Sequence, residues 1–366
     1  MRNFEKTKRV VIKIGTNTLA KGGGIDTAYF TGVAEQVKSL IDAERHVVIV
    51  TSGAIGMGAG QLGLTEKPRE MKMRQACAAI GQPLLMREYR KAFEQKGVQV
   101  AQVLVTAEVL TNRKTYLNLR NAIEALLELG VVPVLNENDS VSTAEIGTAF
   151  GDNDKLSALV ASKIDADLLI MLTDIDALYD KNPQEHADAK PIPVVFEITE
   201  EIIRNAGGSG SVHSTGGMKT KIEAARIAAN AGCRIVLANG REDRVISRIM
   251  SGEPLGTIFM PKRKLSNRAR WILNSSPAGT IRVDDGALKA LRNHKSLLPS
   301  GVTGVEGSFE QGEVVMINQA AKAVASIGSA QLEDLAGKHS REIKKLLGPS
   351  HRDVVAIPED IVFLDY

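Results

Sequence analysis

A lysine lies inside the apolar run Val10–Ile14, and Gly15 follows directly after that run. The run has the length and composition of a buried parallel strand, which would take the Lys13 ammonium group out of water. A buried ammonium is costly unless it meets an anion, so Lys13 is a candidate ligand for a phosphate or carboxylate. The alternative is an edge strand whose lysine points to solvent, a common protection of sheet edges.

A second candidate is the loop TSGAIG at 51–56, which follows the apolar run Val47–Val50. If a helix begins there, its first backbone N–H groups can hold an anionic group. Gly58–Gly63 then matches GxGxxG, but it is separated from the strand, and no acidic residue ends a second strand about 20 residues later. We therefore attribute this match to chance in a chain with 33 glycines.

A third glycine loop begins a strongly helical segment and reads Thr215-Gly216-Gly217-Met218-Lys219-Thr220-Lys221. It is not a Walker A loop, because GxxxxGK[ST] occurs nowhere in the chain. Adjacent glycines at a helix start, with lysines in reach, suit the terminal phosphates of a nucleotide. A glycine helix cap with solvated lysines is the structural alternative.

Acidic and amide residues cluster after further strand candidates. NEND at 136–139 follows one apolar run, GDND at 151–154 opens the next helical segment, and TDID at 173–176 follows another run. Any one of them could simply cap a helix, because Asp and Asn are favoured at helix starts. Together they supply groups that can bind an amino acid's ammonium, orient lysines or a metal–nucleotide complex, or contact a base or ribose.

Strand-like and helix-like segments alternate up to about residue 255, and such alternation needs crossover connections. The strand-like runs are Val10–Ile14, Val47–Val50, Val98–Val105, Val131–Leu135, Leu168–Leu172 and Arg234–Leu237. The helix-like segments are Thr27–Glu44, Glu70–Glu94, Tyr116–Leu129, Lys155–Lys163 and Met218–Ala231. The alternation predicts an α/β fold with a doubly wound, mainly parallel sheet sandwiched by helices, which binds ligands at the carboxyl ends of its strands.

The pattern changes after this α/β domain, which we assign to residues 1–260. Residues 261–278 resemble a basic linker, because positions 262–270 hold five basic residues and no acid. These basic residues are Lys262, Arg263, Lys264, Arg268 and Arg270. Residues 279–366 have short alternating runs separated by glycines, with helical segments at Gly286–Asn293 and Ser340–Leu347. That pattern predicts a second, small β-rich domain.

The composition excludes several classes of protein. Apolar residues make up 43% and charged residues 24% of the 366 residues, as in ordinary globular proteins. The 46 basic and 43 acidic residues nearly balance, so charge alone does not predict a nucleic-acid partner. The two cysteines and six histidines show no disulfide or metal-ligand spacing, and we assign no metal ligands. With no signal peptide or membrane span in the pattern, we expect a cytoplasmic protein without a membrane partner.

Taken in order, VIKIGT, TSGAI, NENDSV, GDND, LTD and TGGMKTK resemble the amino-acid kinase family, in its glutamate 5-kinase branch. The chain from Gly279 onward resembles the PUA domain that many bacterial members of this branch carry. The resemblance implies an ATP-dependent kinase with Mg²⁺ that converts L-glutamate to L-glutamyl 5-phosphate, the first step towards proline. In this family, phosphoryl transfer proceeds by positioning and charge neutralisation, without a covalent intermediate.

The resemblance also implies a role for each site residue. Lys13 and Lys221 would contact the transferring phosphoryl group, and Asp154 would hold both lysines in place. The glutamate-binding residues would be Ser52, Asp139 and Asn153. The nucleotide would be bound by Lys13, Gly15, Gly53, Thr173, Asp174 and the loop Thr215–Lys221, with Gly15 and Gly53 offering backbone N–H groups.

Several rival functions remain open at this stage. Acetylglutamate kinase, aspartokinase, carbamate kinase and uridylate kinase belong to the same fold, but NENDSV with TGGMKTK and a PUA-like tail favours the glutamate 5-kinase branch. A dehydrogenase would rest on Gly58–Gly63 alone, and an RNA-binding protein on the tail and residues 262–270. The resemblance further predicts feedback inhibition by proline within 136–150, a homo-oligomer (dimer or tetramer), and at most weak, salt-sensitive RNA binding.

Overall fold

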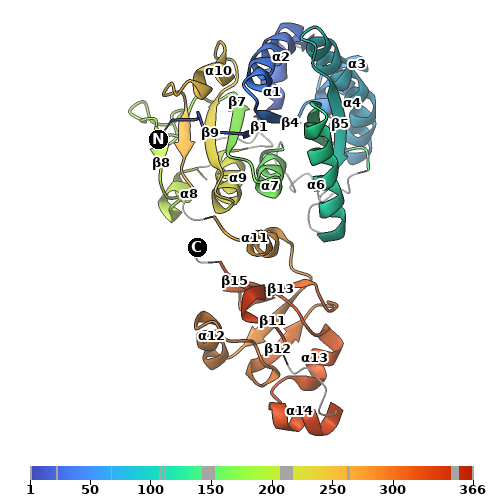
Figure 1. Cartoon of the computed structure of the whole chain (residues 1–366), viewed down its shortest axis with the longest axis vertical. Helices are drawn as coiled ribbons and strands as arrows, with labels where there is room; N and C mark the ends of the chain where they lie inside the picture. The colour runs from blue at the N-terminus through green and yellow to red at the C-terminus, as the bar shows by residue number, and fades with distance from the viewer. Residues whose placement is uncertain are drawn as a thin grey trace. The chain divides into compact units, whose positions relative to one another are not determined.

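The computed structural model describes residues 2–21, 24–66, 68–106, 109, 113–141, 153–206, 217–261, 264–347 and 354–364. Its internal contacts divide the chain into two units, Met1–Lys264 and Leu265–Tyr366, each with its own sheet (Figure 1). Among the helices in these ranges, none combines the length and the apolar character that crossing a bilayer would need.

The first unit is built on an eight-stranded sheet. From edge to edge its strands are β5 (Val100–Val105), β6 (Val132–Glu137), β4 (His46–Thr51), β1 (Arg9–Ile14), β7 (Leu168–Thr173), β9 (Arg234–Asn239), β10 (Thr257–Phe259) and β8 (Val194–Val195). Neighbouring strands are parallel except β9 and β10. The prediction of a doubly wound, mainly parallel sheet is confirmed. Strands β8 and β10 were not predicted, because two or three residues show too little periodicity.

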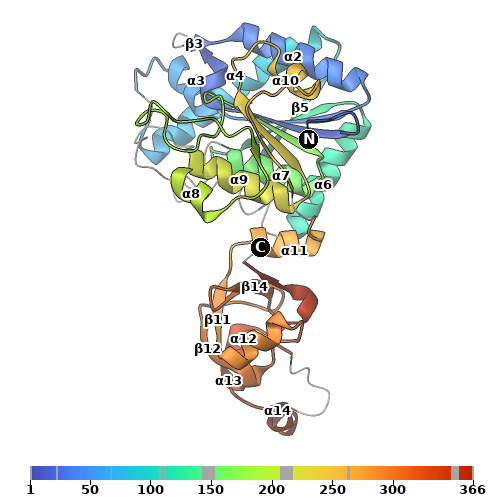
Figure 2. The ribbon, with the colours of Figure 1, turned by 90° about the vertical axis from the view of Figure 1, so that its left-hand side faces the viewer.

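Helices cover both faces of this sheet (Figure 2). One face packs in a single apolar core with α2 (Thr27–Asp42), α4 (Met71–Glu94) and α10 (Val245–Met250). The other face packs with α6 (Arg113–Glu128), α7 (Asp154–Lys163) and α9 (Met218–Asn230). The remaining short elements are α1 (Thr16–Leu19), β2 (Ala20–Lys21), β3 (Gly24–Ile25), α3 (Ala54–Gln61) and α8 (Glu200–Ala206).

The alternation of side chains along β1 decides where its lysine points. Ile12 and Ile14 belong to the core under α2 and α4, whereas Val11 belongs to the core under α7 and α9. Because successive side chains of a strand point to opposite faces, Lys13 lies on the same face as Val11. Its long side chain is therefore directed towards the helices α7 and α9.

The second unit is the predicted β-rich module. Its five-stranded sheet has the order β12 (Val302–Glu306), β11 (Gly279–Val283), β13 (Val314–Ile317), β14 (Ala321–Val324) and β15 (Ile361–Phe363). Its helices are α11 (Asn267–Asn274), α12 (Asp285–Arg292), α13 (Ser329–Leu335) and α14 (Ser340–Leu347), with 3₁₀ turns at Pro299–Gly301 and Pro358–Asp360.

The stretch 261–278, expected to be a basic linker, differs from that expectation over α11. Ile272 of this helix is fully buried against strands β13, β14 and β15, and Arg268 forms an ion pair with Asp360. The many basic residues of this segment predicted a linker. The burial of a single apolar side chain, Ile272, instead attaches α11 to the second unit. Lys262 and Arg263 lie outside the described residues.

Candidate active site

The carboxyl ends of the central strands meet at one edge of the parallel sheet. Ile14 of β1 is in register with Thr51 of β4 and with Leu172 of β7. The next residues along these strands, Gly15, Ser52 and Thr173, therefore line the same edge. This edge is where an open α/β sheet binds its ligands.

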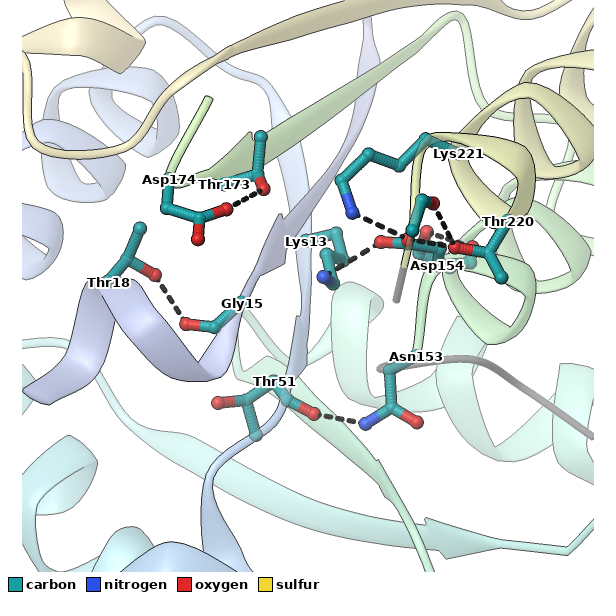
Figure 3. A network of polar contacts seen from close by, with 12 residues as sticks. Lys13, Gly15, Thr18, Thr51, Asn153, Asp154, Thr173, Asp174, Thr220 and Lys221 are labelled. Atoms are coloured by element: carbon teal, nitrogen blue, oxygen red, sulfur yellow. Dashed lines mark hydrogen bonds and ion pairs between the residues drawn. The ribbon is translucent and has the colours of Figure 1, made fainter. Parts of the chain in front are cut away.

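Two lysines and one aspartate form the centre of the site (Figure 3). Lys13 Nζ lies 2.8 Å from Asp154 Oδ1, and Lys221 Nζ lies 3.2 Å from Asp154 Oδ2. The Lys13 and Asp154 side chains are 1% and 0% exposed, so this pair is withdrawn from water. Thr220 also donates its hydroxyl to Asp154 Oδ2 at 3.0 Å. Among the described residues, two ammonium groups thus contact the same carboxylate, a concentration of charge suited to the phosphates of a nucleotide.

Each member of this cluster comes from a different element. Lys13 is on β1, Asp154 is the first residue of α7, and Lys221 is in the first turn of α9. The sequence-based inference that Lys13 is buried and meets an anion agrees with this geometry, and the edge-strand alternative does not, since β1 is a central strand. Gly217 caps α9 without a side chain, and Lys219 points to solvent while Lys221 is buried.

Asn153 connects the carboxyl ends of β4 and β6. Its Nδ2 donates to the carbonyl of Thr51 at 2.5 Å and to Asn136 Oδ1 at 2.7 Å. The residue is buried and adopts φ 64°, a left-handed conformation that asparagine tolerates better than most residues. Ser52, 5% exposed, donates its N–H to the carbonyl of Ile14 at 3.2 Å.

The two candidate phosphate-loop glycines differ. Gly53 has φ 101°, and an added Cβ would lie 3.2 Å from the Leu19 side chain, so glycine is required there. The N–H of Gly15, in contrast, donates to the carbonyl of Leu172 at 3.0 Å. The expectation that Gly15 offers its N–H to a phosphate is therefore corrected, because the ladder from β1 to β7 continues through this group.

Asp139 follows β6 in the loop that was expected to bind glutamate. Burial raises the pKa of its carboxyl to about 6, and the positive charge of Arg74 on α4 partly opposes that rise. A carboxyl with a pKa this close to neutrality changes charge in the range where enzymes work. Asp139 is half-buried, so a substrate group can still approach it.

A second polar cluster lies at the end of β7. Thr173 donates its hydroxyl to Asp174 Oδ1 at 2.9 Å, and Asn17 donates Nδ2 to Asp174 Oδ2 at 2.7 Å. Burial alone would raise the pKa of Asp174, but these hydrogen bonds outweigh it and the pKa is lowered. Figure 3 shows Asp174 and Thr173 on the far side of Lys13 from Asn153. Asn17 was not predicted, since an asparagine in a short helical turn carries no distinctive spacing.

Two further buried side chains, those of Gln82 and Tyr89, were not predicted from the sequence. Asn136 donates Nδ2 to Gln82 Oε1 at 2.8 Å, and Tyr89 donates its hydroxyl to Thr51 Oγ1 at 2.9 Å. Gln82 and Tyr89 lie on α4, where a helical pattern alone does not distinguish a functional polar residue. The one available signal was a glutamine directly before Pro83 within a helical segment.

The GxGxxG match at Gly58–Gly63 has a packing explanation. A Cβ on Gly58 would lie 1.9 Å from the carbonyl oxygen of Cys77, and one on Gly81 would lie 1.8 Å from that of Ala54. These glycines allow α3 and α4 to touch backbone to backbone, which removes the basis for the dehydrogenase interpretation. Thr215 and Gly216, as well as residues 142–152, lie outside the described residues.

Comparison with known proteins gives consistent matches. A model described as the amino acid kinase family matches residues 8–239, and one described as the PUA domain matches residues 279–347. A glutamate 5-kinase of Methanosarcina mazei is 47% identical, covering 99% of this chain and 97% of that protein. A glutamate 5-kinase of Caldanaerobacter subterraneus is 44% identical, covering 98% of both chains. Carbamate kinase from Giardia lamblia bound to AMP-PNP shares the fold, with TM-score 0.50 and 14% identity over 70% of this chain and 99% of that one.

Proposed function

The chain belongs to the amino acid kinase family, and from this premise we propose that it transfers the terminal phosphoryl group of ATP to the side-chain carboxylate of L-glutamate. The product would be L-glutamyl 5-phosphate, the first intermediate towards proline. Relatives named glutamate 5-kinase match the chain over nearly its full length. The observation that carries the chemistry is the buried cluster of Lys13, Asp154 and Lys221 at the carboxyl edge of the sheet.

The reaction needs positive charge more than it needs a base. The glutamate side chain is ionised at neutral pH, so its oxygen can attack phosphorus without first losing a proton. A new O–P bond forms to the terminal phosphoryl group while the bond to the β-phosphate oxygen breaks, and ADP leaves with that electron pair. Two anions must approach each other, and Lys13 and Lys221 offset their repulsion.

Asp154 is best understood as a positioning residue. Its two oxygens each bind one lysine, which fixes both ammonium groups before any ligand arrives. We assign glutamate binding to Ser52, Asp139 and Asn153. The nucleotide-binding set of the resemblance is kept, with Gly15 contributing its small size rather than its N–H.

Magnesium enters as part of the proposal. Within the described ranges, no group of three or more His, Cys, Asp or Glu side chains could hold a metal ion. Mg²⁺ is usually bound through substrate phosphates with one or two carboxylates, so such a group is not required. We propose that Mg²⁺ accompanies the ATP phosphates, where it would neutralise part of their charge.

Proline is the proposed feedback inhibitor. It shares the α-carboxylate and the charged nitrogen of glutamate but has no side-chain carboxylate to phosphorylate. It would therefore occupy the contacts around Asp139 and compete with glutamate. Initial rates at several glutamate concentrations test this, and inhibition that glutamate does not relieve would place proline at a separate site.

Assembly and the tail complete the proposal. We propose a cytoplasmic homo-oligomer, either a dimer or a tetramer, since apolar side chains such as Leu129 and Phe196 are 76% and 62% exposed and self-association could cover them. Sedimentation velocity measures that oligomeric state.

RNA binding by the PUA-like unit would be weak, because basic and acidic residues nearly balance within it. A binding assay at rising salt tests this.

Trapping of the product tests the activity directly. With ATP, Mg²⁺ and glutamate, hydroxylamine should convert the acyl phosphate to a hydroxamate that can be quantified. Acetylglutamate, aspartate, carbamate and uridylate serve as parallel substrates. Strong turnover of one of these without hydroxamate from glutamate would assign the chain to another branch of the family.

A further inference from the structure

Gln82 is held against the turn that follows β4. Its neighbour Gly81 packs so closely that an added Cβ would lie 1.8 Å from the carbonyl oxygen of Ala54, the first residue of α3. Its other neighbour, Pro83, has no N–H to donate within the helix. The position of Gln82 relative to the loop containing Ser52 is thus fixed by backbone contact.

The orientation of the Gln82 amide follows from a chain of hydrogen bonds that starts at backbone groups. The carbonyl of Thr51 can only accept, so the Asn153 atom beside it is the donor Nδ2. The N–H of Glu137 can only donate, so the Asn136 atom beside it is Oδ1. Asn136 Nδ2 must then donate to Gln82 Oε1, at 2.8 Å. The remaining atom of Gln82 is therefore the donor Nε2.

This donor has no hydrogen-bond acceptor among the described residues, although Gln82 is only 8% exposed. A buried donor without an acceptor is unfavourable and calls for an explanation. At a distance from bulk water, a hydrogen bond made to this amide would also be stronger than one at the surface.

The backbone of Asn136 lies at the same edge of the sheet as that of Lys13. Lys13 is in register with Val50, and Val50 with Leu135, so Asn136 is one residue beyond the level of Lys13 and two strands away. Two strand spacings are about 10 Å. This backbone separation is comparable to the length of an extended glutamate, whose two carboxyl carbons are about 5 Å apart, with a hydrogen bond of about 3 Å at each end.

We propose that Gln82 Nε2 donates a hydrogen bond to the α-carboxylate of glutamate and so selects the length of the substrate. This inference rests on the proposed function. With the side-chain carboxylate at Lys13 and Lys221, Asp139 binds the ammonium group and Gln82 the α-carboxylate. Aspartate, one methylene shorter, cannot reach both ends, which gives the site a physical reason to reject it.

Two substitutions separate a direct contact from an indirect one. Gln82→Leu removes both polar atoms. Gln82→Glu is nearly isosteric and keeps an acceptor for Asn136 Nδ2, but it removes the donor and places a negative charge near the substrate's carboxylate. A direct contact predicts a loss of about 10- to 100-fold in kcat/KM for glutamate in both variants, mainly through KM. A role limited to orienting Asn136 predicts that Gln82→Glu stays near the wild type, which would overturn the proposal.

Gln36 provides a matched control. It is likewise a buried helical glutamine, 9% exposed, and its Oε1 accepts from the N–H groups of Ile246 and Ser247 away from the site. Gln36→Glu should leave the KM for glutamate unchanged. The KM for ATP should also stay unchanged in the Gln82 variants, which shows that they remain folded around the nucleotide.

A truncated substrate completes the test. 4-Aminobutanoate is glutamate without its α-carboxylate, and its turnover can be followed as the hydroxamate at high enzyme concentration. If Gln82 contacts that carboxylate, Gln82→Leu lowers kcat/KM for glutamate but causes no comparable loss for 4-aminobutanoate. Equal losses with both substrates would overturn the inference. Absence of hydroxamate from glutamate with the wild-type protein would instead contradict the proposed function itself.

Discussion

At the residue scale, Lys13 was the most predictable member of the site. A charged side chain inside an apolar run has few ways to be stable, and burial against a carboxylate is one of them. Asp154 and Lys221 needed the family resemblance, because an aspartate at a helix start and a lysine after glycines are also ordinary capping features. Gln82 was not predicted, because its one sequence signal was its place before Pro83 and its orientation depends on hydrogen bonds between residues up to 102 positions apart.

Replacing either buried lysine tests the centre of the site. Lys13→Ala and Lys221→Ala should each lower kcat by about 10²–10³, because the lost charge is needed most when negative charge shifts in the transition state. The KM for glutamate should change far less. Steady-state kinetics measure both. Lys155→Ala is a suitable control, since Lys155 is next to Asp154 in sequence but pairs with Glu223 at 3.6 Å. Near-normal kcat in both variants would contradict the assigned roles.

Asp139 should link substrate binding to stability. Its folded pKa of about 6 lies above the ordinary value of 3.8 for an aspartate, so between these values the native state binds more protons than the unfolded state. The free energy of unfolding therefore falls as pH rises through this window. Asp139→Asn should raise the free energy of unfolding by up to about 2 kcal/mol at pH 8 and by little at pH 4, while raising the KM for glutamate.

Urea denaturation at the two pH values measures the stability effect of Asp139→Asn. Wild-type kcat/KM for glutamate should fall below about pH 6 as the carboxylate is protonated. A variant that is destabilised at pH 8, or that keeps the wild-type KM, would contradict this account.

At the element scale, the predicted strands and helices of the first unit agree closely with the observed ones, because each has a clear apolar pattern. Helix α11 was missed because its attachment depends on Ile272, one apolar residue among basic ones. The contact between α3 and α4 was also missed. From sequence alone, glycines in a helical segment indicate a weak helix or a nucleotide-binding loop. The structure shows that they let the backbones of α3 and α4 pack directly against each other.

This contact gives a matched pair of substitutions. In Gly58→Ala the new Cβ would lie 1.9 Å from the Cys77 carbonyl oxygen, so α4 must shift and carry Gln82 with it. We expect a loss of about 1–3 kcal/mol in the free energy of unfolding together with a higher KM for glutamate. Gly60 is in the same helix with nothing within 4 Å of its Cβ position. Gly60→Ala should be neutral or stabilising by up to about 1 kcal/mol.

Denaturant unfolding measures the stability of Gly58→Ala and Gly60→Ala, and steady-state kinetics measure their KM for glutamate. Equal stability of both would show that the packing between α3 and α4 is looser than the backbone distances indicate.

At the scale of the whole molecule, the sequence predicted two domains because the pattern changes from alternating long strands and helices to short alternating runs separated by glycines, with two helical segments. It placed the start of the second unit later than the contacts do, at 279 rather than at Leu265. The difference is α11. This helix packs in one core with β13, β14 and β15, which follow it in the sequence by about 40 residues or more, so a local sequence pattern cannot predict the contact.

The division of the chain predicts where it can be cut. Every residue assigned to chemistry lies at or before Lys221, and the first unit ends at Lys264 with its own apolar cores. A chain of residues 1–264 should therefore fold and phosphorylate glutamate with a kcat comparable to that of the full chain. A chain ending at Leu273 should be less soluble, because it keeps most of α11 and exposes Ile272 without the strands that bury it. Circular dichroism, sedimentation and the hydroxamate assay on both truncations make the comparison. A folded, soluble 1–264 chain without kinase activity would mean that residues beyond Lys264 help to form the active site, and the independence of the first unit would have to be abandoned.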